Sequence, residues 1–226
     1  MRRSIRWRYV GLALAVVLAI GMVIQPVSGE AKTAAPAVEL KVALLPIFDV
    51  LPFYVAQDEG FFEAEGIRIT ALPVGSALER DQLLQAGEID GVVNEMTTVA
   101  NFNRRQARVK IVGVARGAVP GFPLFRFLAA PGSGFSSPAD LAEVPIGISR
   151  NTIIEYVTDR LLTASGLKPE QIVKRSVPVI PERYQLLMQG QIKAAVIPDP
   201  LAKSAVEAGA VEVLNDTAAP RYSMSV

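Results

Sequence analysis

Residues 79–89 read ERDQLLQAGEI and residues 182–192 read ERYQLLMQGQI, so one motif occurs twice in this chain of 226 residues. Each copy follows a β-rich segment, at residues 67–74 and 172–179, and leads into an apolar run. The glycine near the end of each motif is typical of a helix terminus. The repeat therefore predicts one strand–helix–strand unit in each half of the chain.

Strands and helices also alternate around the two copies, which is the pattern of a parallel sheet covered by helices. A further strand is predicted at residues 111–115, and residues 116–137 are rich in Gly, Pro and Phe, as expected of a crossover. We predict an α/β fold with two similar lobes, each with a mainly parallel sheet flanked by helices. A cleft between two such lobes is suited to binding a small molecule.

The N-terminus indicates export. An apolar run at residues 9–24 ends at Gln25 and Pro26, before small residues at 27–31, and four arginines precede it: Arg2, Arg3, Arg6 and Arg8. This pattern is typical of a secretory signal peptide. An uncleaved membrane anchor is the alternative, because the run is slightly longer than the usual ~7–15-residue signal core, although it is shorter than the ~20 residues of a full span. We expect a protein of the periplasm or cell-envelope exterior of a bacterium.

The composition excludes several kinds of chemistry. The chain has no cysteine and no histidine, which rules out disulfides, thiolate nucleophiles, His-based triads and His-rich zinc sites. We expect no metal site and no cofactor. Removing the four N-terminal arginines changes the formal net charge from +1 to −3, so a nucleic-acid partner is not expected either.

Three passages resemble one family. Residues 52–67 (PFYVAQDEGFFEAEGI) are similar to the opening pattern of ABC-importer substrate-binding proteins, in the branch that binds nitrate, alkanesulfonates, taurine and thiamine pyrimidine precursors. Residues 84–90 and 187–196 resemble its paired glycine turns, and Asp199-Pro200 resembles its acidic residue and proline after a strand. The resemblance covers residues 40–226 and implies the type II periplasmic binding fold.

Two features depart from that pattern. Members of the branch continue further and return from the second lobe to finish the first, so we expect a C-terminally truncated member whose first lobe is incomplete. Lys193 replaces the usual acid of the second copy. The expected division is signal peptide 1–29, linker 30–38, first lobe 39–115, second lobe 116–216 and the start of a return segment 217–226.

Ligands of open α/β sheets bind beyond the carboxyl ends of strands, next to helix N-termini. The candidate ligand-binding residues at such ends are Phe48, Asp49, Gly75, Ser76, Asn94, Glu95, Thr97, Thr98, Arg150, Asn151, Thr152 and Asp199. Residues 94–98 form the preferred segment, because they combine amide, carboxylate and hydroxyl groups after an apolar strand. Helix capping is the alternative interpretation for most of these polar residues.

The resemblance implies a solute-binding component of an ABC importer that delivers a small organic solute to a membrane permease and its ATPase. Arg150 and the helix N-termini suit a sulfonate or nitrate-like anion, whereas Asp49, Glu95 and Asp199 suit a nitrogen heterocycle such as a thiamine pyrimidine precursor. The protein is expected to be monomeric, without enzyme activity, and to meet the membrane only through the transporter or an uncleaved anchor.

Two alternatives remain at this stage. The first is an enzyme of the same fold, of the pyrimidine-synthase or menaquinone-pathway dehydratase type. The absence of histidine and the presence of an export signal disfavour it. The second is a sensor, which would need a partner domain.

Overall fold

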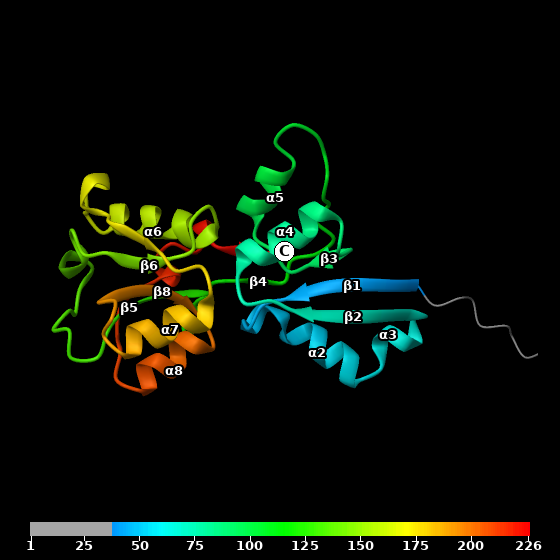
Figure 1. Cartoon of the computed structure of the whole chain (residues 1–226), viewed down its shortest axis with the longest axis horizontal. Coiled ribbons are helices and arrows are strands. Elements are labelled where there is room, and N and C mark those ends of the chain that lie inside the picture. The colour runs from blue at the N-terminus through cyan, green and yellow to red at the C-terminus, as the bar shows by residue number, and fades with distance from the viewer. Residues whose placement is uncertain (1–37) are drawn as a thin grey trace, which may run out of the picture. The chain divides into compact units, whose positions relative to one another are not determined.

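The computed structural model describes residues 38–226 (Figure 1). The predicted signal peptide and all but the last residue of the predicted linker lie outside the described residues. Within residues 38–226, no helix has the length and apolar character that a membrane span requires. Two α/β parts make up this region, and we call them lobe 1 and lobe 2 after their separate sheets.

Lobe 1 contains a three-stranded parallel sheet in which β1 (Val38–Leu44) lies between β2 (Ile67–Pro73) and β3 (Gly91–Val92). Its helices are α2 (Leu51–Asp58), α3 (Phe61–Ala64), α4 (Ala77–Ala86) and α5 (Met96–Phe102), with the 3-10 turn η1 (Phe48–Val50) before α2.

Helix α4 begins and ends as the repeat predicts. The Ser76 hydroxyl accepts a hydrogen bond from the Glu79 amide at 3.1 Å, and Gly87 ends the helix with a φ of 74°. The Glu79 carboxylate accepts from the amide of Gly75 at 3.0 Å, one residue earlier than in a regular capping box.

Lobe 2 contains a five-stranded mixed sheet in the order β7-β6-β8-β5-β9. Its strands are β5 (Phe125–Ala129), β6 (Ile146–Ile148), β7 (Lys174–Ser176), β8 (Ala194–Pro198) and β9 (Val211–Asn215). Strand β6 is parallel to β7 and β8, whereas β5 is antiparallel to β8 and β9. The helices are α6 (Ile153–Ala164), α7 (Ile180–Met188) and α8 (Leu201–Glu207), with 3-10 turns η2 (Pro138–Leu141), η3 (Pro169–Gln171), η4 (Asp216–Ala218) and η5 (Pro220–Tyr222).

Side chains of the lobe 2 sheet alternate between two cores. Helix α6 covers one face of the sheet, and α7 and α8 cover the other (Figure 1). In β5, Phe127 packs in the core that α6 completes, whereas Leu128 packs in the core that α7 and α8 complete. This alternation is the period of two that a strand imposes. The second core also includes Ala43 and Val74 of lobe 1, so apolar packing continues from one lobe into the other.

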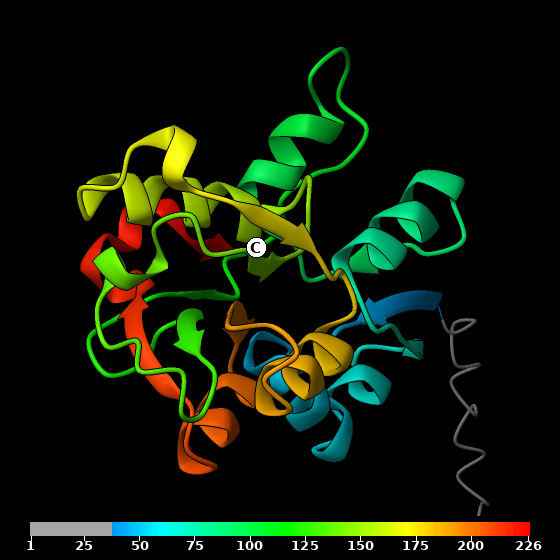
Figure 2. The same cartoon turned by 60° about the vertical axis from the view of Figure 1, so that its left-hand side comes forward.

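A short antiparallel pair, which we call the crossover pair, joins β4 (Arg116–Gly117) to β10 (Met224–Ser225). Next to it, Asn94 and Val226 exchange two backbone hydrogen bonds of 2.9 and 2.7 Å. The turns η4 and η5, which precede β10, pack against α6 (Figure 2).

The predicted strand at residues 111–115 is wrong. These residues belong to no strand, and Val112 is fully exposed. A strand forms only where a neighbour accepts its backbone hydrogen bonds, and in this segment only the Ala115 amide has a backbone acceptor among the described residues, the carbonyl oxygen of Ser225 in β10 at 2.9 Å. The second β-rich segment, residues 172–179, also forms a strand only at its centre, in β7.

Candidate functional site

The predicted site residues follow the carboxyl ends of five strands. In lobe 1 they follow β1, β2 and β3, and in lobe 2 they follow β6 and β8. The structure divides them into three groups: residues held in buried ion-pair networks, residues in contacts between the lobes, and residues that line an open groove.

Asn94 and Glu95 belong to a buried network around Arg80 of α4. The Arg80 guanidinium donates to Asn94 Oδ1 at 2.6 Å and to Glu95 Oε2 at 3.1 Å. Its remaining nitrogens donate to Asp81 Oδ1 at 2.9 Å and to the carbonyl oxygen of Val93 at 3.0 Å. Burial alone would lower the pKa of Arg80, but the two carboxylates raise it above its usual value. These predicted site residues therefore have partners within lobe 1.

Asp49 accepts hydrogen bonds from both strands of the crossover pair. One carboxylate oxygen accepts from Arg116 at 3.1 Å, and the other accepts from the hydroxyl of Ser225. The alternative that Asp49 caps the following helix is wrong, because α2 begins after Val50 and has no side-chain cap.

Asp199 is buried against Arg126 of β5, which donates to its two oxygens at 2.8 and 2.9 Å. This bidentate pair, assisted by Glu212, raises the pKa of the Arg126 guanidinium. Two backbone hydrogen bonds next to these residues join the lobes. The Phe48 amide donates to the carbonyl oxygen of Asp199 at 3.2 Å, and the Ile180 amide donates to that of Gly75 at 3.0 Å.

Four of the predicted residues meet in one place. Thr97 and Thr98 from α5 of lobe 1 line a groove with Asn151 and Thr152 from the start of α6 of lobe 2. The volume of the groove is about 470 Å³. Its other lining residues are Ala100, Asn101, Glu155, Tyr156 and Asp159. We call this hollow the polar groove.

One hydroxyl of the polar groove is unpaired. The Oγ1 atom of Thr97 is buried and has no hydrogen-bond partner among the described residues. Thr152, in contrast, caps α6: its Oγ1 accepts from the Ile154 amide at 3.2 Å and donates to the carbonyl oxygen of Ser149 at 2.8 Å. The capping alternative is therefore confirmed for Thr152, and Thr97 does not cap a helix.

The acidic side chains of the groove have cationic partners. Lys174 lies 3.0 Å from Glu155 and 2.9 Å from Asp159. Burial works against the charged form of Glu155, yet hydrogen bonds from the Asn151 amide and from Lys174 hold its pKa below the usual value. Arg150 is exposed and donates to the carbonyl oxygen of Lys174 at 3.0 Å, outside the groove lining.

A much smaller cavity, of about 20 Å³, lies between residues of both lobes and shares Thr152 with the polar groove. We call it the inner cavity. Its polar lining residues are Glu95, Ser149 and Thr152. Its apolar lining includes Ile180, the first residue of α7, and Ala77, the first residue of α4.

Arg183 of α7 is fully buried and contacts Ser149, which lines the inner cavity. Its Nη1 donates to Ser149 Oγ and to the carbonyl oxygen of Val177, both at 2.8 Å. Its Nε and Nη2 atoms have no partner in the described region, and burial lowers the pKa of this guanidinium to about 9. Sequence reasoning missed both buried arginines. The signal was present, since Glu-Arg opens each copy of the repeated motif.

A larger hollow, of about 600 Å³, lies elsewhere in the described part of the chain. It is lined by the end of α4, by β3 and by residues 108–112. Only Asn94 among the predicted site residues reaches it, and Asn94 already has partners at Arg80 and Asp81. The polar groove is the better candidate site, because both lobes contribute polar groups to it at strand ends.

Comparison with solved structures identifies the fold. The alkanesulfonate-binding protein SsuA from Xanthomonas axonopodis pv. citri, bound to MOPS, superposes with a TM-score of 0.68 at 20% identity, over 85% of this chain and 66% of that chain. The ligand-binding component of an ABC-type import system from Staphylococcus aureus gives 0.67 at 13% identity, over 84% and 65%. The periplasmic nitrate-binding protein NrtA from Synechocystis PCC 6803 gives 0.63 at 13% identity, over 84% and 55%.

These structures confirm the predicted type II periplasmic binding fold, and their descriptions are those of ligand-, alkanesulfonate- and nitrate-binding proteins. The chain spans just under two thirds of the length of the first of them. None of the curated protein sequences matches it significantly. The NMT1/THI5-like family model, however, matches residues 47–212, which is more than half of the chain. The protein therefore belongs to the NMT1/THI5-like family, as its sequence motifs predicted.

Proposed function

We propose that this protein is the solute-binding component of a bacterial ABC importer, acting outside the cytoplasmic membrane. It captures a small organic solute and delivers it to a membrane permease and its ATPase. The observation that carries the proposal is the polar groove, to which lobe 1 contributes Thr97 and Thr98 and lobe 2 contributes Asn151 and Thr152.

The groove has the size and chemistry of a small-molecule site. Its volume of about 470 Å³ lies within the usual range of about 300–1,000 Å³ for such sites. The unpaired Thr97 hydroxyl is buried, so a solute can bond to it only when rotation of a lobe exposes it, whereas Asn101 and Asn151 bring amide groups to the groove lining. Its two carboxylates share a single lysine, Lys174, so the groove combines hydrogen-bonding groups with a carboxylate charge that this lysine balances only in part.

Capture requires that the two lobes enclose the solute. Both sides of the groove belong to helix starts that follow strand ends, so a small rotation of one lobe changes the width of the groove. Enclosure removes water, and each hydrogen bond to the solute then becomes stronger. The NMT1/THI5-like family and the ABC-importer neighbours support this function over catalysis.

The test is a thermal-shift screen of the full chain against a broad metabolite panel that includes sulfonates, nitrate, carboxylates and pyrimidines. A solute at a hundred times its Kd stabilises the folded state by about 2.7 kcal/mol. For a domain of this size, that raises Tm by about 5–10 °C. A screen in which no solute raises Tm contradicts the proposal.

A pair of threonine variants locates the site. Thr97→Val keeps the side-chain shape but removes the unpaired hydroxyl, and we expect about fivefold weaker binding, from the loss of one hydrogen bond worth about 1 kcal/mol. The control, Thr163→Val, makes the same change at an exposed position near the C-terminal end of α6, away from the groove at the start of that helix. It should leave binding unchanged. Equal affinities of the two variants would place the solute elsewhere.

A further inference from the structure

A basic loop follows the C-terminal end of α5. Residues 104–110 read RRQARVK, and the chain has no aspartate or glutamate from residue 96 to residue 139. The four cationic side chains of the loop are exposed, and none of them forms an ion pair within residues 38–226. The loop therefore carries positive charge that no neighbouring carboxylate balances.

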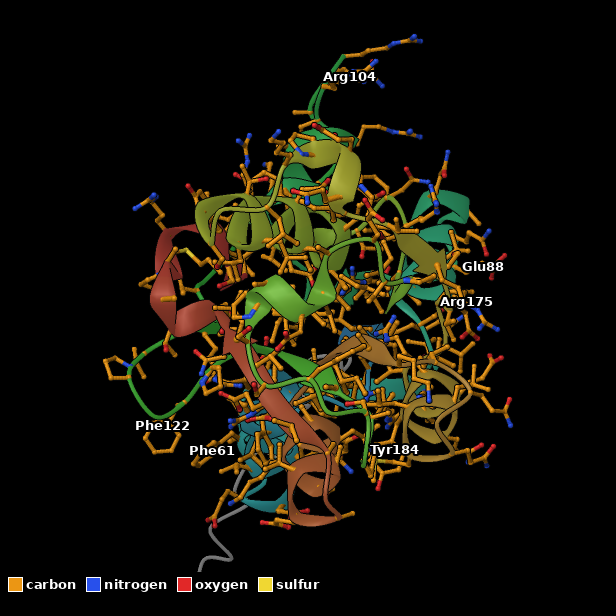
Figure 3. All side chains as sticks on the ribbon, turned by 90° about the vertical axis from the view of Figure 1, so that its left-hand side faces the viewer. Phe61, Glu88, Arg104, Phe122, Arg175 and Tyr184 are labelled. Atoms are coloured by element: carbon orange, nitrogen blue, oxygen red, sulfur yellow. The ribbon has the colours of Figure 1, made fainter. Side chains whose placement is uncertain are left out.

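Asn103 fixes the shape of this loop. Its Oδ1 atom accepts hydrogen bonds from the amides of Arg108 and Val109 at 2.8 and 3.1 Å. Its Nδ2 atom donates to the carbonyl oxygen of Val109 at 3.0 Å. Figure 3 shows Arg104, which follows Asn103, extending away from the rest of the molecule. A loop that is already ordered loses less entropy when it binds a partner.

The arginines of the loop surround a hollow of about 360 Å³, which we call the basic hollow. It is lined by Asn101, Phe102, Arg104, Arg105, Gln106 and Arg108. No carboxylate is among these lining residues. Guanidinium groups present paired donors that match the oxygens of a phosphate. The basic hollow is therefore suited to a group that carries a phosphate.

Apolar side chains lie next to these cations in the sequence. Val112 is fully exposed, and Ile111 and Val114 are 46% and 67% exposed. A nucleic acid would use the cations but would leave these side chains in water. An anionic bilayer uses both, because its headgroups carry phosphate and its acyl boundary accepts apolar side chains. The combination favours a lipid surface as the partner.

We propose that residues 104–114 dock the protein on a bilayer that contains anionic phospholipid, with a headgroup phosphate in the basic hollow and Val112 at the acyl boundary. The inference goes beyond the proposed function, which places the protein outside the cytoplasmic membrane. It adds a direct lipid contact to the two membrane contacts expected from the sequence, the transporter and an uncleaved anchor. Docking would keep the protein near the permease that it serves.

The test uses a fluorescent label at a single cysteine of the full chain, which has no cysteine of its own. Val112→Cys carries an environment-sensitive fluorophore, and the vesicles contain equal amounts of phosphatidylglycerol and phosphatidylcholine. We expect the emission to shift to shorter wavelength with these vesicles but not with phosphatidylcholine alone. Salt at about 0.5 M should reverse the shift, because it screens the charges. The same label at Val206→Cys, an exposed valine of α8 in lobe 2, should not shift.

Charge variants of the labelled protein identify the residues responsible. Arg104→Gln with Arg105→Gln should weaken partition onto the anionic vesicles by about 20–30-fold, at about fivefold for each cation removed. The matched control, Arg175→Gln with Lys203→Gln, removes two exposed cations of lobe 2 and should leave partition nearly unchanged. The apolar run at residues 9–24 is common to all these variants, so it does not account for differences among them.

The inference is overturned if the label at residue 112 shifts no more than the label at residue 206, if phosphatidylcholine alone is as effective, or if the arginine variant partitions like its parent. A single-stranded oligonucleotide that binds through the same arginines, while vesicles leave the label unshifted, would assign the loop to nucleic acid and would also overturn it. The assay contains no solute, so its failure leaves the proposed function standing. A solute screen without any binder would contradict the proposed function and not the lipid contact.

Discussion

The buried arginines make a sharp prediction about stability, because the same substitution at matching positions should have different effects. Arg80→Met leaves the Glu95 and Asp81 carboxylates, which are 7% and 18% exposed, without their cation. Breaking a buried ion pair by removing one partner costs about 3–5 kcal/mol. A typical domain has a total stability of about 5–15 kcal/mol, so the variant should fold but unfold easily.

Arg183→Met removes a buried charge that has no anionic partner, which relieves its desolvation. The substitution also removes the hydrogen bonds to Ser149 Oγ and to the carbonyl oxygen of Val177, each worth about 1 kcal/mol. These two effects oppose each other, so we expect a change within about 1 kcal/mol of the unmodified protein.

Urea denaturation at pH 7, followed by circular dichroism, distinguishes the two variants. With an m-value of about 2 kcal/mol/M, Arg80→Met should lower the midpoint by about 1.5–2.5 M, and Arg183→Met by less than about 0.5 M. The triple variant that adds Asp81→Asn and Glu95→Gln to Arg80→Met should recover part of the loss. Equal losses for the two single variants would refute the assignment of Arg80 as paired and Arg183 as unpaired.

Three further predictions concern single sites. Burial raises the pKa of the Asp216 carboxyl, so the charged form of this group destabilises the folded state once the pH rises above its ordinary pKa of 3.8. Asp216→Asn should therefore be more stable than the unmodified protein at pH 7 and should lose this advantage below about pH 3.8. A stability advantage that stays constant from about pH 3 to 7 would contradict this reasoning. Thr152→Ala removes the cap of α6 and should lower the free energy of unfolding by about 1–2 kcal/mol in urea melts, whereas exposed Thr163→Ala should change it little. Gly147→Ala places a Cβ 2.8 Å from the terminal methyl of Ile192 and 3.4 Å from the Arg183 side chain, so it should cost about 1–3 kcal/mol, and an unchanged midpoint would show that Ile192 moves aside freely.

Much of the fold follows from short-range sequence signals. Gly87 and Gly190 both adopt a left-handed backbone, with φ of 74° and 67°, after helices that the repeated motif predicts. Such signals report what a segment can do locally. The strand predicted at residues 111–115 fails because pairing depends on a partner far away in the sequence, which no local pattern encodes.

The candidate site was harder to predict, because it also depends on contacts between residues that are distant in the sequence. Asn94 and Glu95 have the right chemistry and lie at a strand end, yet Arg80, fourteen residues earlier, takes up their hydrogen bonds. Arginine is usually exposed, so one Glu-Arg pair alone does not indicate a buried arginine, and only its repetition at residues 79–80 and 182–183 marks these two positions. The polar groove depends on the approach of two helix starts from different lobes, and only Thr97, Thr98, Asn151 and Thr152 of the predicted set meet there.

The crossover pair has a consequence for how the chain folds as it is made. Ser225 and Asp49 are 176 positions apart in the sequence, whereas every strand of the lobe 2 sheet lies within residues 125–215. Contacts between distant residues need a longer loop to close, and they form later on average. We expect pulsed hydrogen exchange to find the amides of β5 protected before the amide of Asn94, which donates to Val226; protection in the reverse order would contradict this expectation. Lobe 1 would then complete its packing only after β10, 176 positions beyond Asp49, pairs with β4.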